Sequence, residues 1–243
     1  MLKRIIEKIT GEASEYNSPT DMGVNRAGFC ITDDEICRDA AKQEIIRRYL
    51  LACVDYKKGL ITADALNRAK LLMDEMGLLP EDRRVVKPAL EYAEKKRKSD
   101  PRYENIIAMA MDLPDGRIVT GRSSRRMVAG AALILNAIKR LCCIPDDVLL
   151  VSPDVLATLQ HLKTDILNKE KSSLTLEEVL SALTISAAVN PIAAMAVDKL
   201  RDLAGCRAHC TAILSDADDQ IFHDLSIDTT CEAEFSTNNL YLG

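Results

Sequence analysis

The sequence predicts an α/β protein of mixed α+β type, with an N-terminal helical subdomain followed by a C-terminal subdomain that holds a mixed sheet. Two observations lead to this prediction. Apolar residues recur at helical spacing between residues 36 and 98, with glycines and prolines separating the helical segments. After residue 99, short β-type segments alternate with helical ones, as in proteins that layer helices on a sheet. The predicted regions are therefore 1–31, 32–98 and 99–243.

The first region, 1–31, is predicted to contain a short amphipathic helix, Leu2 to Ile9, and then a Gly-rich polar loop, Ser18 to Phe29. Such a loop buries little apolar surface and is costly to order, so we favour a ligand-binding role. The alternative is a structural loop whose Asp and Asn side chains bond their own backbone. The candidate ligand-binding residues in it are Thr20, Asp21, Gly23, Asn25 and Arg26.

The second region, 32–98, is predicted to be helical. Thr32 and Glu35 form a capping box for a helix that ends near Gly59. A second helix covers Thr62 to Met76, and a third, with Pro88 in its first turn, runs to Lys98. On the first helix, Lys42, Gln43 and Arg47 are further candidate ligand-binding residues, because Gln43 and Arg47 lie one turn apart and could reach the same anion. A solvated surface role for these side chains remains an equal alternative.

The third region, 99–243, contains the predicted strands. Ile106–Met111 and Arg117–Thr120 are joined by Pro114-Asp-Gly116, which indicates a hairpin. Further strands are predicted at Val148–Val151, Ala208–Leu214 and Asp228–Cys231. Helices are predicted at Ser124–Leu141, at two or three places within 153–203 with a break at Asn190-Pro191, and at Asp218–Leu225.

The junction between the predicted strand ending at Thr120 and the helix beginning at Ser124 is a second candidate site. Gly121, Ser123 and Ser124 could present N–H groups and hydroxyls to an anion at the helix start. Arg125 and Arg126 would then lie in the first helical turn, where a cation is disfavoured and an anionic ligand would compensate. We weigh a plain helix cap, with both arginines extending into water, as the somewhat stronger alternative.

Composition excludes several classes of protein. The chain has 243 residues, a net charge of −5 and a pI near 5.4, and only 4% of its residues are aromatic, so we expect no nucleic-acid partner. No signal peptide and no apolar run long enough to cross a bilayer is present, so we expect a cytoplasmic protein without a membrane partner. Its eight cysteines lie mostly in apolar or helical contexts and are expected to be reduced, buried thiols.

Metal and nucleophile motifs receive little support. Cys206, His209 and Cys210 could supply three metal ligands, but His209 and Cys210 point to opposite faces of a predicted strand, so no metal is expected. His209 is expected to be a satisfied core histidine, whereas His161 and His223 occupy surface helix positions. No G-x-S-x-G elbow and no P-loop is present. Catalytic residues and cofactors are therefore left unassigned, and whether the chain is an enzyme stays open.

Eleven segments give the chain a resemblance to a bacterial family. They are Ser18 to Phe29, Asp33-Asp34-Glu35, Lys42 to Tyr49, Lys57-Lys-Gly59, Val86 to Ala93, Leu113-Pro-Asp-Gly116, Thr120-Gly121, Ile144-Pro-Asp-Asp147, Asn190-Pro191, Gly205-Cys206 and Asn239-Leu-Tyr241. With these segments the chain resembles the domain-of-unknown-function family 1846, also called uncharacterised protein family 0371.

The resemblance implies several further features. Family members are about twice as long as this chain, and their first half carries a separate Gly-rich, nucleotide-loop-like segment. The chain therefore resembles a C-terminal half, or a truncated form, whose α/β subdomain has a topology similar to the cytidine-deaminase-like fold. The family brings no assigned reaction, and a shared fold does not by itself carry function.

Two hypotheses about function follow. In the first, the chain is the C-terminal part of a cytoplasmic enzyme-like protein that binds a small anionic or nucleotide-like metabolite, in a site shared with a missing N-terminal half. In the second, it is a non-catalytic module that senses a ligand or assembles a homo-oligomer. In both, a small-molecule ligand and a homo-oligomer are the expected partners.

Overall fold

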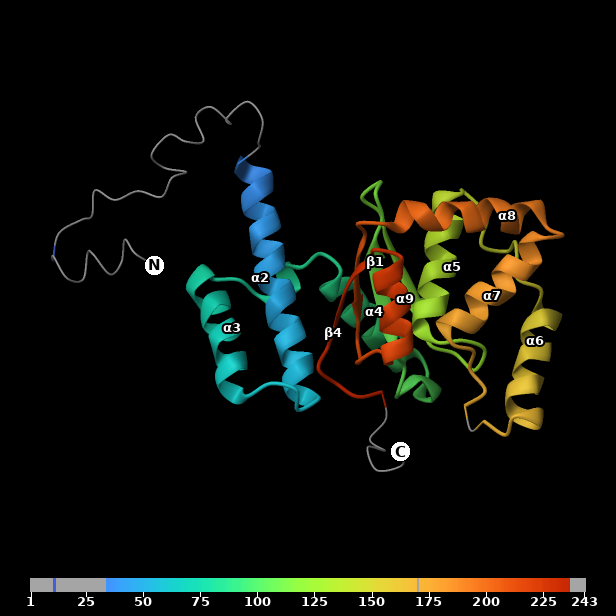
Figure 1. Ribbon diagram of the computed structural model, residues 1–243, viewed down its shortest axis with the longest axis horizontal. Helices are drawn as coiled ribbons and strands as arrows, with labels where there is room; N and C mark the ends of the chain where they lie inside the picture. Colours follow the sequence, from blue (N-terminus) through green and yellow to red (C-terminus); the bar gives the residue numbers. More distant parts are fainter. Residues whose placement is uncertain (1–10, 12–33, 170, 237–243) are drawn as a thin grey trace. The chain divides into compact units, whose positions relative to one another are not determined.

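The computed structural model describes Gly11, residues 34–169 and residues 171–236 (Figure 1). The chain divides into two compact units, Met1–Glu44 and Ile45–Gly243, which are described separately. The predicted helix at Leu2–Ile9, the polar loop and the capping threonine at position 32 lie outside the described residues.

Three helices occupy the region predicted to be helical: α2 (Asp34–Lys57), α3 (Ala63–Met76) and α4 (Val86–Ser99). All three were predicted. The α3 helix ends at Gly77, whose φ of 62° is the left-handed conformation that glycine adopts at little cost. Within the second unit, one apolar cluster joins these helices, and its buried members are Ile46, Leu50, Met73 and Val86.

A four-stranded mixed sheet has the order β2-β1-β3-β4. Its strands are β1 (Ala108–Asp112), β2 (Ile118–Arg122), β3 (Arg207–Cys210) and β4 (Asp228–Cys231). The β1 strand pairs antiparallel with both β2 and β3, and β3 pairs parallel with β4. The predicted hairpin between β1 and β2 is confirmed, with Gly116 at a φ of 81° in the turn.

The side chains of β1 alternate between two apolar layers. Ala108 and Ala110 belong to small clusters with residues of α4, whereas Met109 and Met111 join the main core with α5 (Ala129–Leu141). Because successive side chains of a strand point to opposite faces, α4 covers one face of the sheet and α5 the other.

Further helices extend the layer that begins with α5. In Figure 1, α5, α7 (Leu176–Ala187) and α6 (Pro153–His161) follow one another away from the sheet, in agreement with the contacts of α7 with both of the others. The layer also includes α8 (Pro191–Asp198) and α9 (Asp216–Asp224), and shorter helical turns lie at Pro80–Asp82, Pro101–Tyr103, Leu162–Ile166 and Lys199–Leu203. The predicted break at Asn190 is confirmed, since its side chain caps α8.

Three predicted elements differ from the structure. The strand predicted at Ala208–Leu214 is β3, which begins at Arg207 and ends at Cys210. Val148–Val151 is a loop, although Leu150 and Val151 are buried in the main core. An apolar run of this kind satisfies a core position equally well without a partner strand. The predicted helix at Ser124 begins instead at Ala129, because Ser124 donates its backbone N–H to the Met127 carbonyl at 2.9 Å and closes a turn there. The deaminase-like topology is not confirmed.

None of the helices that the structure describes combines the length and the apolar composition that a membrane span requires.

Candidate functional site

The strands β2, β3 and β4 run in the same direction, because the two that flank β1 are both antiparallel to it and β4 is parallel to β3. Their carboxyl ends, at Arg122, Cys210 and Cys231, therefore meet at one edge of the sheet. In open α/β sheets, ligands bind in crevices outside the carboxyl ends of the strands. Both cavities described below border this edge.

The larger cavity is an open cleft of about 1040 Å³. Five of its lining residues are cations, and no described lining residue is an aspartate or a glutamate. The cations are Arg102, Arg122, Arg125, Arg126 and Lys171. The other lining residues are Tyr103, Asn105, Ile106, Ser123, Ser124, Ser172 and Ser173. We call this surface the basic cleft.

Ser123, directly after β2, fixes one wall of the basic cleft. Its backbone N–H donates to the Ile107 carbonyl at 2.8 Å, and its hydroxyl accepts the Ile107 N–H at 3.0 Å. These two bonds extend the β1–β2 pairing by one residue. Beside it, the Arg122 guanidinium lies over the Tyr103 ring, 4.8 Å from the centroid, a cation–π contact that orients the charge.

The opposite wall is made by two loops that are fastened together through their backbones. Leu174 donates its N–H to the Arg126 carbonyl at 2.9 Å, and Val128 donates to the Leu174 carbonyl at 3.0 Å. The Gln160 amide donates to the carbonyls of Arg125, at 2.8 Å, and Ser172, at 3.3 Å. These hydrogen bonds to the two loops are made to backbone groups, so they do not involve the charged side chains of the loops.

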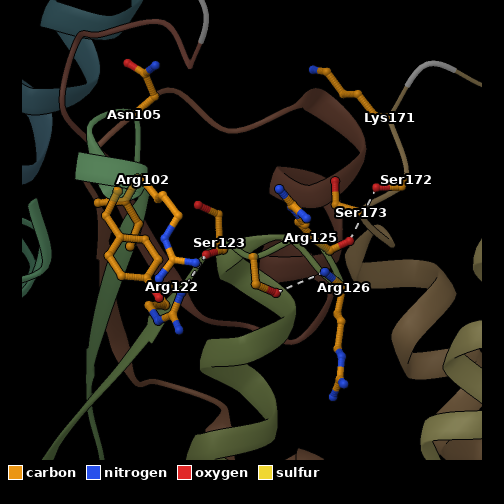
Figure 2. A pocket seen from close by; sticks show the side chains of 12 residues that line it. Arg102, Asn105, Arg122, Ser123, Arg125, Arg126, Lys171, Ser172 and Ser173 are labelled. Atoms are coloured by element: carbon orange, nitrogen blue, oxygen red, sulfur yellow. Dashed lines mark hydrogen bonds between the residues drawn. The ribbon is translucent and has the colours of Figure 1, made fainter. Parts of the chain in front are cut away.

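Figure 2 shows Arg102 and Arg122 on one side of the view and Arg125, Lys171 and Ser173 on the other, with Ser123 between them. Arg102 makes an ion pair with Asp100 at 2.6 Å. In the part of the chain that the structure describes, Arg125, Arg126 and Lys171 have no carboxylate partner. Apart from Arg102, the cations of the basic cleft therefore hold positive charge that no described carboxylate neutralises.

The structure changes the interpretation of the predicted anion site. Ser124 is not a helix cap; its hydroxyl accepts the N–H groups of Arg126 and Met127, each at 3.2 Å, inside the turn. Because the helix begins only at Ala129, Arg125 and Arg126 avoid the unfavourable first turn. Ser123 and Ser124 line the basic cleft, and the arginines rather than the helix start supply its positive potential.

Gly121 does not line the basic cleft, and its environment indicates a packing role. A Cβ atom at this position would lie 2.3 Å from the Leu133 backbone nitrogen and 2.6 Å from the Leu133 Cα. Only glycine allows β2 and α5 to approach this closely.

A second, more enclosed cavity of about 370 Å³ adjoins the basic cleft and shares Ser123, Lys171 and Ser173 with it. We call it the inner cavity. Most of its wall is apolar, and its polar groups are hydroxyls, two lysines and one carboxylate. The remaining lining residues are Ile107, Val128, Ala129, Gly130, Lys163, Thr175, Cys210, Ile213, Leu214, Ser215, Asp218 and Ser236.

Two charged groups of the inner cavity are held by hydrogen bonds. Asp218 is buried and accepts the Leu176 N–H at 3.1 Å and the Ser215 hydroxyl at 2.9 Å. Lys163 donates to the Ser173 carbonyl and to Glu178, both at 2.8 Å. Burial raises the pKa of Glu178, but hydrogen bonds from Lys163 and Thr175 outweigh this and hold the pKa below its ordinary value.

The other predicted ligand-binding residues are divided between described and undescribed parts. Thr20, Asp21, Gly23, Asn25 and Arg26 lie outside the described residues. Lys42 and Gln43 lie on α2, with Gln43 one turn before Arg47 as predicted. Arg47 donates through Nε to the Asp228 carboxylate at 2.8 Å, which gives it a structural contact. A shared site of these residues stays a prediction.

The predicted core histidine is confirmed. His209 is buried and hydrogen-bonds through Nδ1 to the Thr230 hydroxyl at 3.0 Å and through Nε2 to the Glu232 carboxylate at 3.1 Å. His161 and His223 are exposed, as expected. Among the residues described, no group of three or more His, Cys, Asp or Glu side chains could hold a metal ion. The cysteines there are free thiols, of which Cys37 and Cys143 are exposed rather than buried.

Sequence reasoning missed Arg102, Asn105, Lys171, Ser172 and Ser173 as members of one site. The available signal was weak: Lys171-Ser-Ser173 repeats the pairing of cations with serines seen at Arg122-Ser-Ser-Arg125. Nothing in the local pattern says that these two loops meet.

Comparison with known proteins gives two family matches. The family model of domain of unknown function DUF1846, N-terminal, matches residues 1–77, and that of DUF1846, C-terminal, matches residues 81–241. The chain was expected to resemble only the C-terminal half of a family member. This expectation is wrong, because the model of the family's N-terminal domain also matches the chain.

Curated relatives agree with these matches. A UPF0371 protein of Clostridium botulinum (strain Kyoto / Type A2) is 51% identical over 241 residues, which cover 99% of this chain and 48% of the relative. Another, of Clostridium tetani (strain Massachusetts / E88), is 48% identical with the same coverage. The chain thus spans about half the length of these relatives. On these matches, the chain belongs to the uncharacterised DUF1846 (UPF0371) family.

Proposed function

We propose that this chain binds a small polyanionic metabolite, such as a phosphorylated compound, in the basic cleft. The observation that carries the proposal is the lining itself: five cationic side chains and four serines border one cleft, and no described carboxylate does. Clefts lined by charge of one sign concentrate the field and raise the local concentration of counter-ions.

The overall charge of the chain makes this feature more informative. With a net charge of −5, the protein repels polyanions in general. A cationic cleft on such a protein is a local property, so it favours a ligand small enough to enter it over an extended polyanion that would also meet the acidic surface.

The side-chain types suit phosphoryl groups. A guanidinium presents N–H donors in a planar fork that matches two phosphate oxygens, and charge-assisted bonds of this kind are roughly twice as strong as neutral ones. Ser173 has a hydroxyl at the boundary of both cavities, and the hydroxyl of Ser172 makes only a long contact of 3.5 Å to the Arg125 carbonyl. Both could donate to a bound anion.

Titration calorimetry with sodium tripolyphosphate tests the proposal. The wild type is expected to bind it with an affinity that falls between 0.1 M and 1 M NaCl, as screening shortens the Debye length from about 10 Å to about 3 Å. The double variant Arg122→Gln, Arg125→Gln is expected to bind at least about tenfold more weakly, because two charge-assisted contacts are lost.

Arg201→Gln is the matched control, since Arg201 is exposed on the turn Lys199–Leu203 and lines neither cavity. It should bind like the wild type. If the wild type shows no heat of binding, or if the control weakens binding as much as the double variant, the basic cleft is not an anion site.

A further inference from the structure

We propose that the ligand is a nucleotide, with its phosphates in the basic cleft and its nucleoside in the inner cavity. This inference rests on the proposed anion-binding function and adds the class of the ligand's neutral part. The observation behind it is that a cationic cavity and a mostly apolar cavity adjoin each other where strands β2, β3 and β4 end.

The two cavities form one continuous site. Ser123, Lys171 and Ser173 line both, so a ligand with its charged end in the basic cleft can extend directly past them into the inner cavity. The inner volume of about 370 Å³ lies within the 300–1,000 Å³ usual for small-molecule pockets.

Charge sets the orientation of the ligand. The inner cavity contains the Asp218 carboxylate, and its half-buried lysine, Lys163, is already paired with Glu178 at 2.8 Å. A phosphate placed beside Asp218 would meet a like charge in a partly desolvated site, which is unfavourable. The basic cleft, whose described lining lacks carboxylates, is the favourable place for it, so the neutral end enters the inner cavity.

The apolar walls favour a flat group. Ile107, Val128, Ile213 and Leu214 supply aliphatic surface suited to the faces of a base. A bare sugar phosphate would instead turn several hydroxyls toward these walls without partners, which costs free energy for each group left unpaired. A purely aliphatic ligand would desolvate Asp218 and the hydroxyls of the cavity without giving them partners.

The remaining hydrogen-bonding capacity matches the polar edges of a nucleoside. The Asp218 carboxylate has about four acceptor sites, of which the Leu176 N–H and the Ser215 hydroxyl use two. Ribose hydroxyls or an exocyclic amino group could fill the others. The Lys163 ammonium has three N–H bonds, two of them used, so one remains for an acceptor of the ligand.

The test compares ATP, GTP, CTP and UTP with tripolyphosphate by titration calorimetry on the same protein. Tripolyphosphate reports on the basic cleft alone, because it has no nucleoside. We expect at least one of the four nucleotides to bind about tenfold tighter than tripolyphosphate or better. The Ile213→Phe variant, which adds volume to the inner cavity only, should remove this advantage and leave tripolyphosphate affinity unchanged.

Circular dichroism establishes that the variant is folded, and Leu214→Phe replaces it if it is not, since Leu214 lines the same wall. If tripolyphosphate binds and none of the nucleotides binds more tightly, the nucleotide inference is overturned while anion binding stands. If a nucleotide binds more tightly but both filled variants keep that advantage, the nucleoside does not lie in the inner cavity and the inference is again overturned. If neither tripolyphosphate nor any nucleotide binds, both proposals fail.

Discussion

Arg83 has 0% of its surface exposed, and its Nη2 donates to the carbonyl oxygen of Asp228 at 2.8 Å and forms an ion pair with the Asp228 carboxylate at 3.0 Å. Its Nε and Nη1 atoms are also buried and have no hydrogen-bond partner among the residues described. Burial lowers the pKa of Arg83, while the contact with Asp228 opposes that shift. An arginine side chain stays charged in proteins. The buried positive charge of Arg83 is therefore compensated mainly by the Asp228 carboxylate.

The first prediction follows from the dependence of the buried Arg83 charge on Asp228. Asp228→Ala should lower the free energy of unfolding by about 3–5 kcal/mol, because it leaves a buried guanidinium without its counter-ion. Urea titration followed by circular dichroism measures the loss. Arg47→Gln removes a half-exposed partner of the same carboxylate and should cost about 1 kcal/mol or less.

Replacing Arg83 itself distinguishes the stability that comes from its ion pair with Asp228 from the stability that comes from the packing of its side chain. Arg83→Met removes the charge and keeps most of the side-chain volume, so it should cost clearly less than Asp228→Ala. Equal losses in the two variants would show that Asp228 stabilises the fold for some other reason than the buried charge.

The second prediction concerns Gly121. Gly121→Ala places a Cβ atom 2.3 Å from the Leu133 nitrogen, a backbone atom that cannot turn aside, so β2 and α5 must separate. Overpacking of this kind costs about 1–3 kcal/mol and occasionally more. Gly77→Asn is the control. The φ of Gly77 is 62°, in the left-handed region that asparagine tolerates, and nothing lies within 4 Å of an added Cβ. A Tm for Gly121→Ala equal to that of this control would contradict the close approach of the two elements.

The third prediction is a pH dependence at Glu178. Its pKa is lowered from an ordinary value of 4.5, since hydrogen bonds from Lys163 and Thr175 outweigh burial. The stabilisation is therefore fully present above the unfolded-state pKa and is lost as the pH falls through the lower folded-state pKa. The side chain is 36% exposed, so solvent screening keeps the effect small.

We expect the Tm difference between the wild type and Glu178→Gln to be largest near pH 7 and to shrink as the pH falls below about 4. Glu177→Gln, an exposed carboxylate in the same first turn of α7, provides the comparison. If the Tm difference between the wild type and Glu178→Gln stays constant from pH 7 to pH 3, ionisation of Glu178 does not cause the pH dependence.

The sequence predicted those features that depend on neighbouring residues in the chain. It did not predict the features that depend on the pairing of distant strands. Asp228–Cys231 was predicted with the bounds that β4 has, helped by its two threonines, which favour strands. Val148–Val151 has an equally suitable composition, yet it is a loop, because none of the strands that the structure describes pairs with it. Strand pairing joins segments far apart in the chain, which composition and periodicity do not reveal.

The same limit applies to the site. Ser123 was predicted from its place after a strand, a local property. Lys171 and Ser173 come to the same cleft through the bonds of Leu174 with Arg126 and Val128, and no spacing in the sequence encodes those bonds. Misplacing the start of α5 by a few residues also placed the predicted anion site at a helix end, whereas the positive charge around the basic cleft belongs to side chains that precede the helix or lie in other segments.

The fourth prediction concerns thiol reactivity. Burial, with the nearby carboxylates of Asp112 and Asp115, raises the pKa of Cys206 to about 11. The pKa of buried Cys210 is also raised, by its hydrogen bond with Cys231 and by burial. Because the thiolate is the reactive form, neither should react with iodoacetamide at pH 8 in the folded protein, whereas exposed Cys143 should. Peptide mapping by mass spectrometry distinguishes the sites, and modification of Cys206 at the rate of Cys143 would contradict the burial.

The fifth prediction tests whether the two loops of the basic cleft must be held together for binding. Gln160, on α6, lines neither cavity, yet its amide donates to Arg125 in one loop and Ser172 in the other. Gln160→Ala removes both bonds and no charge. It should cost about 1 kcal/mol of stability, and it should weaken tripolyphosphate binding several-fold because the cations of the two loops are no longer held at a fixed separation.

Gln220→Ala is the matched control, since the amide of exposed Gln220 donates to Asp224 on the same helix, α9, and Gln220 lines neither cavity. The control should leave binding unchanged. If Gln160→Ala binds tripolyphosphate as tightly as the wild type, the backbone bonds of Leu174 with Arg126 and Val128 are sufficient to position the cations. Weaker binding in Gln160→Ala with an unchanged salt dependence would instead show that geometry, and not the amount of charge, limits the affinity of the basic cleft.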